Sequence, residues 1–579
     1  MKKEHTGQGA KGLKFKVPAA VVAIAMLAVA FAGFLPSASD GSDNSTLGAI
    51  EGAWDGVTIA AEFEFGDGTP GDPFLIYTPE ELAFLANRVN AGDTDYNSAS
   101  YRLAKDIYLN DESSTHPWTP IGNLSDHFEG EFDGGNHTIY GIYIELIVTP
   151  VAANDYRGLF GYVEGGTISD LTVKNYDITG RDYIGGVVGY LKDSIITNVG
   201  AEGGSIESVP TNTTNGRFVG GVVGYAVNST ITECYNTGTV KAETRVGGVV
   251  GQAYSHSTVN LCYNIGDVKG NVANGTSIGG VAGLLNDKSI AVNCFNNGTV
   301  TGWRAGGVIG QLNDSDLHNS YNWGKVIGAN AAGVVGSSVA GGHILNCYNW
   351  IDPEIQDGVS IVGNFTGGGT DNCFYFVGTT KQGSIGNIDI PENNTFDGNL
   401  MTDELGDGEG LRLDKVLDDW TDTNASPVGI ESYSGWMLAA HPDGGVFPVL
   451  TNLTAYVTVN IEGSGDYELD PFDATLMFPN VYAKGTTVTV IMTPDEGGEL
   501  SSVFVGGVEV TPVEDDGVFT YTFTLFENTI VDVEFINIIP PPNGGPGKCL
   551  HYLLPLIIVS LILFALIFFG AKCRCKKDE

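Results

Sequence analysis

Basic residues are scarce in this chain. Its 579 residues include 28 Lys and Arg against 69 Asp and Glu, which gives a formal net charge of -41. Only 17% of the residues are charged, so the imbalance comes from missing Lys and Arg and not from an acidic tract. A chain with this charge repels the phosphates of nucleic acids. We therefore expect no nucleic-acid partner.

Helical periodicity is missing from the middle of the chain. The apolar runs there are short, rich in Val, Ile and aromatic residues, and separated by Gly and Asn. None of them reaches the ten or so residues with a period of about 3.6 that a crossover helix requires. This pattern excludes helical solenoids and leucine-rich repeats.

Signatures of metal chemistry are missing as well. None of the nine His residues is followed by Glu, so the chain has no His-Glu-x-x-His zinc site. No Cys-x-x-Cys pair accompanies the five Cys residues of the middle region, and no His stands at zinc-site spacing. We expect neither a metal nor a cofactor.

What the middle does contain is a repeated Gly-rich phrase. It reads Gly-Gly-Val-Val-Gly at 185–189, 220–224 and 247–251. From Gly161 to Gly336, the last Gly of each successive copy follows the previous one by 28, 35, 27, 32, 27 and 26 residues. Self-similarity with a period of about 20 to 50 residues indicates a solenoid, in which each repeat buries its apolar face against its neighbours.

Two further phrases recur at fixed places in the repeats. One is Cys-Tyr-Asn or a close variant, as at 234–236, and the other is Gly-x-Val, as at 238–240. Three short strands per turn without a helix predict a parallel β-helix of coils of about 27 residues over 101–380. The Asn residues of the second phrase would then stack and exchange hydrogen bonds between their amides, and they would suit a tight left-handed corner.

The Cys residues of the second phrase form a column of their own. Metal ligation or a disulfide ladder is one interpretation, and small buried side chains at a repeated core position is the other. Parallel Cβ atoms in adjacent coils lie about 4.8 Å apart, which exceeds the roughly 3.5–4.5 Å that a disulfide prefers. The spacing favours the buried column, with these members: Cys234, Cys262, Cys294, Cys347 and Cys373, with Ser320 in the remaining slot.

The two ends of the chain predict export and membrane anchoring. Residues 1–39 read as a signal peptide, although an uncleaved anchor is also compatible with the long apolar run. Residues 550–571 are an apolar segment long enough to cross a bilayer, and the basic tail 572–579 belongs in the cytoplasm. The large N-terminal part is therefore expected outside the cell, attached to the lipid bilayer by a single C-terminal helix.

Smaller regions are expected between these ends. Residues 40–100 contain a helix with a capping box at Thr78-Pro79-Glu80-Glu81, expected to cover the first coil. Residues 381–452 lose the repeat and are expected to cap the last coil. Residues 453–537 alternate in polarity, which predicts a small β-sandwich-like domain, and the Pro- and Gly-rich stretch 538–549 is a linker.

The repeated phrases, and the lead-in segments 101–107, 118–122 and 128–139, resemble the GLUG repeat of secreted and surface proteins. That family includes adhesins and the repeat regions of some IgA-cleaving metallopeptidases. The resemblance covers about residues 70–380. It implies a surface location and often adhesion, and it does not imply catalysis by the repeats. Residues 455–537 are similar to small β repeats near the anchors of bacterial and archaeal surface proteins.

Three Trp residues are the candidate binding residues. Trp323 and Trp350 occupy the same slot in successive coils, and Trp303 is close in sequence. Stacked rings on an outer corner would form a platform for sugars or for an apolar patch of a partner, whereas rings packed over the coil corner would be structural. We expect an adhesin-like or envelope protein that binds glycans or proteins of other cells.

An enzyme of surface polysaccharides is the alternative. Asp287, Asp314 and Asp316 follow the Gly-rich strand in adjacent coils. Paired carboxylates about 5–9.5 Å apart can act as acid and base in glycoside cleavage, but an acidic loop edge would look the same in the sequence. A stalk without any ligand is a third possibility.

Overall fold

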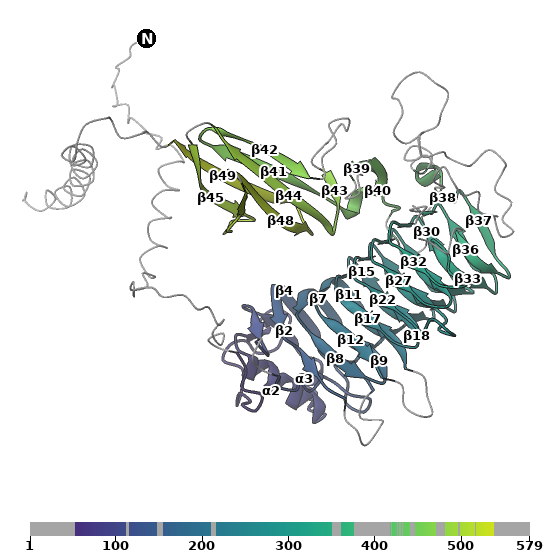
Figure 1. The fold of residues 1–579 in the computed structure, drawn as a ribbon. Helices are drawn as coiled ribbons and strands as arrows, with labels where there is room; N and C mark the ends of the chain where they lie inside the picture. The colour runs from purple at the N-terminus through teal and green to yellow at the C-terminus, as the bar shows by residue number, and fades with distance from the viewer. Residues whose placement is uncertain are drawn as a thin grey trace, which may run out of the picture. The chain divides into compact units, whose positions relative to one another are not determined.

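The structure is a computed structural model, and its secondary structure is all β apart from short helices (Figure 1). It describes residues 53–111, 115–146, 155–209, 216–349, 361–375, 417, 420–424, 426–427, 430, 432–440, 446–470, 481–495, 498–515 and 517–537. The predicted signal peptide, the linker, the apolar segment 550–571 and the basic tail lie outside these residues. No helix among the described residues is long and apolar enough to cross a membrane.

The helix predicted before the first coil is present. Helix α2 (Pro79–Asn90) begins at Thr78, whose hydroxyl accepts from the Glu81 backbone N–H, while the Glu81 carboxylate accepts from the Thr78 backbone N–H. Its buried apolar residues belong to the same hydrophobic cluster as the coils that follow. Strand β1 (Phe74–Ile76) already pairs in parallel with β2 (Ser100–Leu103), so parallel stacking begins before residue 101. A second short helix is α3 (Thr94–Asn97).

The repeats form a parallel β-solenoid of about ten turns, as the sequence predicts. The strand pairs within the described solenoid are parallel, and each pair joins equivalent positions of adjacent coils, such as Val188 with Val223. The strands of the coils stack into four sheets, which we number 1 to 4 in the order in which a complete coil passes through them. The prediction of three strands per turn was wrong in this detail, because the Gly-Gly pair divides the Gly-rich phrase between sheets 1 and 2.

Sheets 1, 2 and 4 each stack one strand per coil. Sheet 1 contains β9 (Asp182–Gly185), β13 (Arg217–Gly220), β18 (Thr244–Gly247), β23 (Ile278–Gly279) and β28 (Ala305–Gly306). Sheet 2 contains β6 (Phe160–Glu164), β10 (Val188–Lys192), β14 (Val223–Val227), β19 (Val250–Tyr254), β24 (Ala282–Asn286), β29 (Ile309–Asn313), β33 (Val335–Val339) and β36 (Val362–Phe365). Sheet 4 contains β5 (Tyr143–Ile144), β8 (Asp177–Gly180), β12 (Ser205–Ser208), β17 (Thr239–Lys241), β22 (Val268–Lys269), β27 (Val300–Thr301) and β32 (Val326–Ile327).

Sheet 3 runs the length of the solenoid, and from β15 onward each of its coils has two short strands. Its members besides β1 and β2 are β3 (Ile107–Tyr108), β4 (Glu131–Tyr140), β7 (Thr167–Lys174), β11 (Ile195–Glu202), β15 (Thr230–Thr232), β16 (Tyr235–Asn236), β20 (Thr258–Asn260), β21 (Tyr263–Asn264), β25 (Ile290–Val292), β26 (Phe295–Asn296), β30 (Asp316–His318), β31 (Tyr321–Asn322), β34 (His343–Leu345), β35 (Tyr348–Asn349), β37 (Gly369–Asp371) and β38 (Phe374–Tyr375).

A ladder of buried Asn amides runs through the core, which confirms the predicted stacking. The Nδ2 atoms of Asn236, Asn264, Asn296 and Asn322 each donate to the Oδ1 of the Asn in the next coil at 2.8 Å. Each also donates to the carbonyl two residues ahead, as from Asn296 to Gly298 at 2.8 Å. Because these amides are buried, such bonds satisfy groups that would otherwise be costly to remove from water. The members of this inner ladder are Asn236, Asn264, Asn296, Asn322 and Asn349.

The inner ladder explains why the Gly-Gly pair and the Asn recur together. The second Gly of each pair lies against the amide of its own coil and the backbone of the next. A Cβ on Gly280 would lie 2.0 Å from Gly307 O and 2.3 Å from Asn296 Cγ, so no side chain fits. The corresponding pairs are Gly221 with Asn236, Gly248 with Asn264, Gly307 with Asn322 and Gly333 with Asn349.

The left-handed corner of sheet 3 is not at the inner ladder, where the sequence placed it. It lies at the residue before the Cys column, where φ is 56° at Asn293 and 49° at Asn319. Asn tolerates this conformation better than most residues. Asn293, Asn319, Asn346 and Asn372 form an outer ladder, in which each Nδ2 donates to the Oδ1 of the preceding coil, as from Asn319 to Asn293 at 2.7 Å.

The C-terminal residues form two further sheets that share a core, the arrangement of a sandwich. The larger one contains β39 (Trp436–Ala440), β40 (Val446–Leu450), β41 (Thr454–Glu462), β43 (Val481–Ala483), β45 (Gly498–Val505), β46 (Val508–Glu509) and β49 (Thr529–Asn537). The smaller contains β42 (Gly465–Asp470), β44 (Thr486–Pro494), β47 (Val513–Asp515) and β48 (Val518–Leu525). Val457 and Val533 of the larger sheet share one buried cluster with Val488 and Val490 of the smaller.

Candidate functional site

The structure separates the predicted Trp residues. Trp323 follows β31, between sheets 3 and 4, is only 6% exposed, and donates from Nε1 to the Tyr348 hydroxyl at 2.7 Å. Trp303 follows β27, between sheets 4 and 1, and is half-buried. Trp350 lies outside the described residues. The expectation of Trp323 on an open outer corner is not met, because other side chains cover its ring.

Trp323 belongs to a buried cluster that joins aromatic residues of the coils to residues of the C-terminal part of the chain. Successive coils stack the aromatic residue that precedes each inner-ladder Asn, with ring centroids 5.0–5.3 Å apart. Trp436, Leu450 and Leu453 pack against this column, and Trp436 Nε1 donates to Asn319 Oδ1 of the outer ladder at 2.7 Å. The described part of 381–452 therefore packs along the side of the coils. The column contains Tyr235, Tyr263, Phe295, Tyr321 and Tyr348.

The carboxylates of the alternative enzyme lie at a corner of the solenoid. Asp287 and Asp314 follow strands that pair in register, Asn286 with Asn313, and both have left-handed backbone, with φ of 54° and 49°. Asp316 Oδ1 accepts a hydrogen bond from the backbone N–H of His343 at 2.8 Å and lies 3.1 Å from His343 Nδ1. Asp tolerates left-handed backbone better than most residues, so the corner gives a structural reason for Asp287 and Asp314. No trio of His, Cys, Asp or Glu among the described residues is placed to hold a metal ion.

The Cys column is buried, as favoured from its spacing. The five described Cys residues are free thiols that are at most 5% exposed. Burial raises the pKa values of the Cys262 and Cys294 thiols well above their ordinary value. Ser320 fills the same slot and donates from Oγ to the His318 carbonyl at 2.7 Å. These thiols are therefore inert packing groups.

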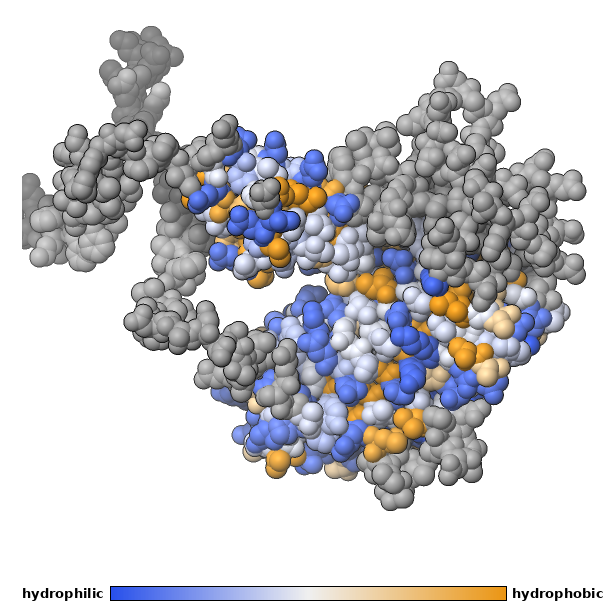
Figure 2. Space-filling view, in the orientation of Figure 1, coloured by the Kyte–Doolittle hydropathy of each residue, from blue (hydrophilic) through white to orange (hydrophobic). Residues whose placement is uncertain are grey.

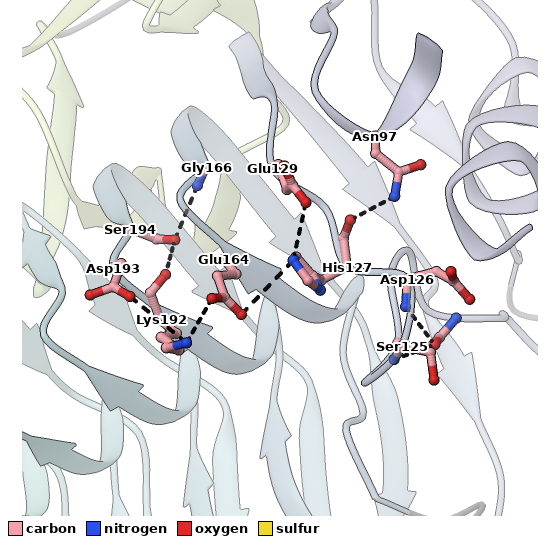
Figure 3. A network of polar contacts seen from close by, with 11 residues as sticks. Asn97, Ser125, Asp126, His127, Glu129, Glu164, Gly166, Lys192, Asp193 and Ser194 are labelled. Carbon is pink, nitrogen blue, oxygen red and sulfur yellow. Dashed lines mark hydrogen bonds and ion pairs between the residues drawn. The ribbon is translucent and has the colours of Figure 1, made fainter. Parts of the chain in front are cut away.

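A cluster of charged residues at the turn between sheets 2 and 3 is internally paired (Figure 3). Lys192 Nζ lies 2.6 Å from Glu164 Oε1 and 4.0 Å from Asp193 Oδ2. His127 Nε2 lies 3.1 Å from Glu129 Oε1 and 3.9 Å from Glu164 Oε2. Lys192 pairs with Glu164 of the preceding coil, and His127 contacts both Glu129 and Glu164, so the cluster joins three coils.

Arginine residues gather where the chain enters sheet 1. Arg181 directly precedes β9, Arg217 begins β13, Arg245 is the second residue of β18 and Arg304 directly precedes β28. Arg157 bridges to Ile184 of β9. We call these five residues the arginine edge. Trp303 belongs to this edge, since the guanidinium carbon of Arg304 lies 4.6 Å from the centroid of its ring.

Two columns of aromatic rings lie beside the arginine edge. In one column, the rings of Tyr156, Tyr183 and Phe218 stack at centroid distances of 5.0 and 4.8 Å. In the other, the ring of Tyr190 stacks on that of Tyr162 at 4.5 Å and lies tilted against that of Tyr225 at 5.1 Å. Burial raises the pKa of Tyr156 to about 12, so the phenols remain neutral hydrogen-bonding groups near neutral pH.

The sequence contains a faint signal of this site that the repeat phrases obscure. Tyr190 and Tyr225 directly follow the Gly-Gly-Val-Val-Gly phrase in two copies, and Gln252 takes this place in the third. The arginines stand just before the same phrase. Reading the outward positions on both sides of the phrase would have identified the edge. In the view of Figure 2, hydrophobic patches alternate with hydrophilic residues.

Comparison with known proteins agrees with the solenoid. Residues 218–241 match the GLUG motif family, which confirms the resemblance seen in the sequence, so the chain carries a GLUG repeat. A segment is 30% identical over 226 residues to halomucin from Haloquadratum walsbyi. The aligned segment covers 36% of this chain and spans only 2% of the length of halomucin. No solved structure matches the chain.

Proposed function

We propose that this protein is an extracellular surface protein whose solenoid binds glycans or proteins of the cell surface. The observation that carries the proposal is that the interior positions of the coils are repeated while their outer positions vary. The repeated Gly, Cys and Asn residues build the interior and its close contacts, whereas partly exposed positions differ between coils: one column reads Glu164, Lys192, Val227, Tyr254, Asn286 and Asn313. Repeat proteins of this kind use the extended outer surface for binding.

The GLUG match, the similarity to halomucin and the charge of the chain support a surface role. A net charge of -41 keeps an exposed protein soluble and separate from its copies. We propose that residues 1–39 direct export, that residues 550–571 anchor the chain in the bilayer, and that it acts in adhesion or as part of the envelope.

Surface labelling tests the location. Intact cells that make the protein are treated with an external protease and with a membrane-impermeant amine reagent. We expect both to reach the solenoid, while a cytoplasmic control protein stays intact and unlabelled. Modification of the solenoid only after lysis would contradict the proposal.

A further inference from the structure

The arginine edge concentrates positive charge in an acidic protein. The chain has nine Arg residues, and five of them belong to this edge. Two carboxylates oppose them: Asp155 pairs with Arg181, and Asp182 lies 3.3 Å from Arg217. Glu243, nearby in sequence, accepts a hydrogen bond from Asn271 Nδ2 at 2.6 Å. Arg157 is only 8% exposed, so the accessible cationic groups of the edge are the other four arginines, and these outnumber the three carboxylates by one.

Two arginines of the edge have no ion pair among the described residues. Arg245 and Arg304 are half-buried, and the guanidinium group of each lies over an aromatic ring. Burial and the nearby Arg217 lower the pKa of Arg245, as expected where cationic groups crowd together. The Nε atoms of Arg217 and Arg304 are buried without a hydrogen-bond partner in this part of the chain.

The aromatic rings orient the guanidinium groups. The Arg217 and Arg245 guanidinium carbons lie 5.2 and 4.8 Å from the centroid of the Phe218 ring. A guanidinium group that contacts a ring through its face keeps its in-plane N–H groups available for a carboxylate or sulfate. Because the side chain is held in place, less conformational entropy is lost when an anion binds.

We propose that the arginine edge binds an acidic polysaccharide, one bearing carboxylate or sulfate groups, along the solenoid axis. The paired strands of sheet 1 place Arg245 and Arg304 two coils apart, about 10 Å along the axis. An extended polymer with regularly spaced anionic groups can therefore contact both arginines. Trp303 and the tyrosines beside the arginines supply apolar surface and hydroxyl groups for the sugar rings.

The rest of the molecule favours a polysaccharide over a nucleic acid. The Debye length is about 8 Å at physiological ionic strength, so the edge acts locally while the distant carboxylates are screened. A duplex would bring a higher density of phosphates near the acidic surface as a whole. This inference rests on the proposed surface function, because acidic polysaccharides are ligands outside the cell.

Binding of the purified full chain to four immobilised polymers tests the proposal. The polymers are polygalacturonate, dextran sulfate, neutral dextran and duplex DNA, compared at equal ionic strength. We expect binding to the two acidic polysaccharides, weaker binding to DNA and none to dextran. The double variant Arg245→Gln, Arg304→Gln should lose at least about tenfold in affinity, since each charge-assisted contact contributes about that factor.

Arg102→Gln is the matched control. It removes one positive charge, as each of the single variants Arg245→Gln and Arg304→Gln does, but from sheet 3, where Arg102 lies 3.5 Å from Asp133, and it should leave affinity within about twofold. The double variant Arg245→Lys, Arg304→Lys keeps the charge and should lose an intermediate amount, and circular dichroism checks that each variant is folded. Unchanged affinity of the Gln variant, equal binding to dextran, or tighter binding to DNA would overturn the proposal. Surface labelling is independent of these results, so a failure here leaves the location proposal standing.

Discussion

Replacing Asn296 with Ala should weaken the solenoid far more than the same change at the end of the inner ladder. Asn296 donates to Gly298 O and to Asn322 Oδ1, and it accepts from Gly298 N and from Asn264 Nδ2, at 2.8–3.2 Å. At about 1 kcal/mol for each hydrogen bond, the loss is about 4 kcal/mol, and the buried partners left unpaired add to it.

Asn349 offers the internal comparison. It accepts from Asn322 Nδ2 at 2.8 Å, and its own Nδ2 has no partner among the described residues. Asn349→Ala should therefore cost about 1 kcal/mol. The Asn297 side chain is half-buried and forms no hydrogen bond with the described residues, so Asn297→Ala controls for the chemical change and should cost less than about 0.5 kcal/mol.

Urea unfolding of the full chain, followed by circular dichroism, measures these differences. Because neighbouring coils contribute separately to stability, amide hydrogen exchange should also show faster opening around 264–322 in the Asn296→Ala variant. Equal losses at Asn296 and Asn349, or a loss below about 1 kcal/mol at Asn296, would refute a stabilising role for the ladder.

Further predictions concern the Gly, Cys and His residues of the coils. Gly280→Ala should cost more than about 3 kcal/mol in urea unfolding, because its Cβ would overlap backbone and Asn296, whereas Gly71→Ala, with nothing within 4 Å, should be nearly neutral. Cys294→Ser should cost less than about 1.5 kcal/mol, because Ser320 already occupies the equivalent slot, and the five buried thiols of the Cys column should react with a thiol reagent only after unfolding. Burial lowers the pKa of His318 to about 4 from an ordinary 6.5, so between these values the unfolded chain binds a proton that the folded chain does not. Stability should therefore fall by about 2 kcal/mol from pH 7.5 to pH 5, and this fall should be absent in His318→Asn.

The sequence predicted the interior of the solenoid well because each interior contact joins equivalent positions of adjacent coils. A residue type repeated once per coil, such as Asn264 and Asn296, must then lie in one column. The packing of the C-terminal part could not be predicted in this way. Its contacts, such as Ser434 N with Asn293 Oδ1 at 2.9 Å, join residues 141 positions apart and follow no repeat.

The candidate site was also only partly predictable. Trp303 was named from its residue type, and the structure places it beside Arg304. Trp323 occupies the same slot of the repeat as Trp350 in the sequence, but the structure places Trp323 in a buried cluster with Trp436 and the aromatic column. Arg217, Arg245 and Arg304 are not equally spaced in the sequence, so the repeat period does not align them; their places just before the Gly-rich phrase are the faint signal, and the strand pairing of sheet 1 shows that they lie on one edge.

The opposite directions of the two amide ladders have a consequence for length. Inner-ladder amides point their N–H groups toward later coils, and outer-ladder amides point theirs toward earlier coils. Their dipoles oppose each other, unlike the peptide dipoles of an α-helix, which add up along its axis. Each additional coil therefore contributes hydrogen bonds without enlarging a net side-chain dipole at either end, so such a solenoid can be extended by further turns with little electrostatic penalty from its ladders.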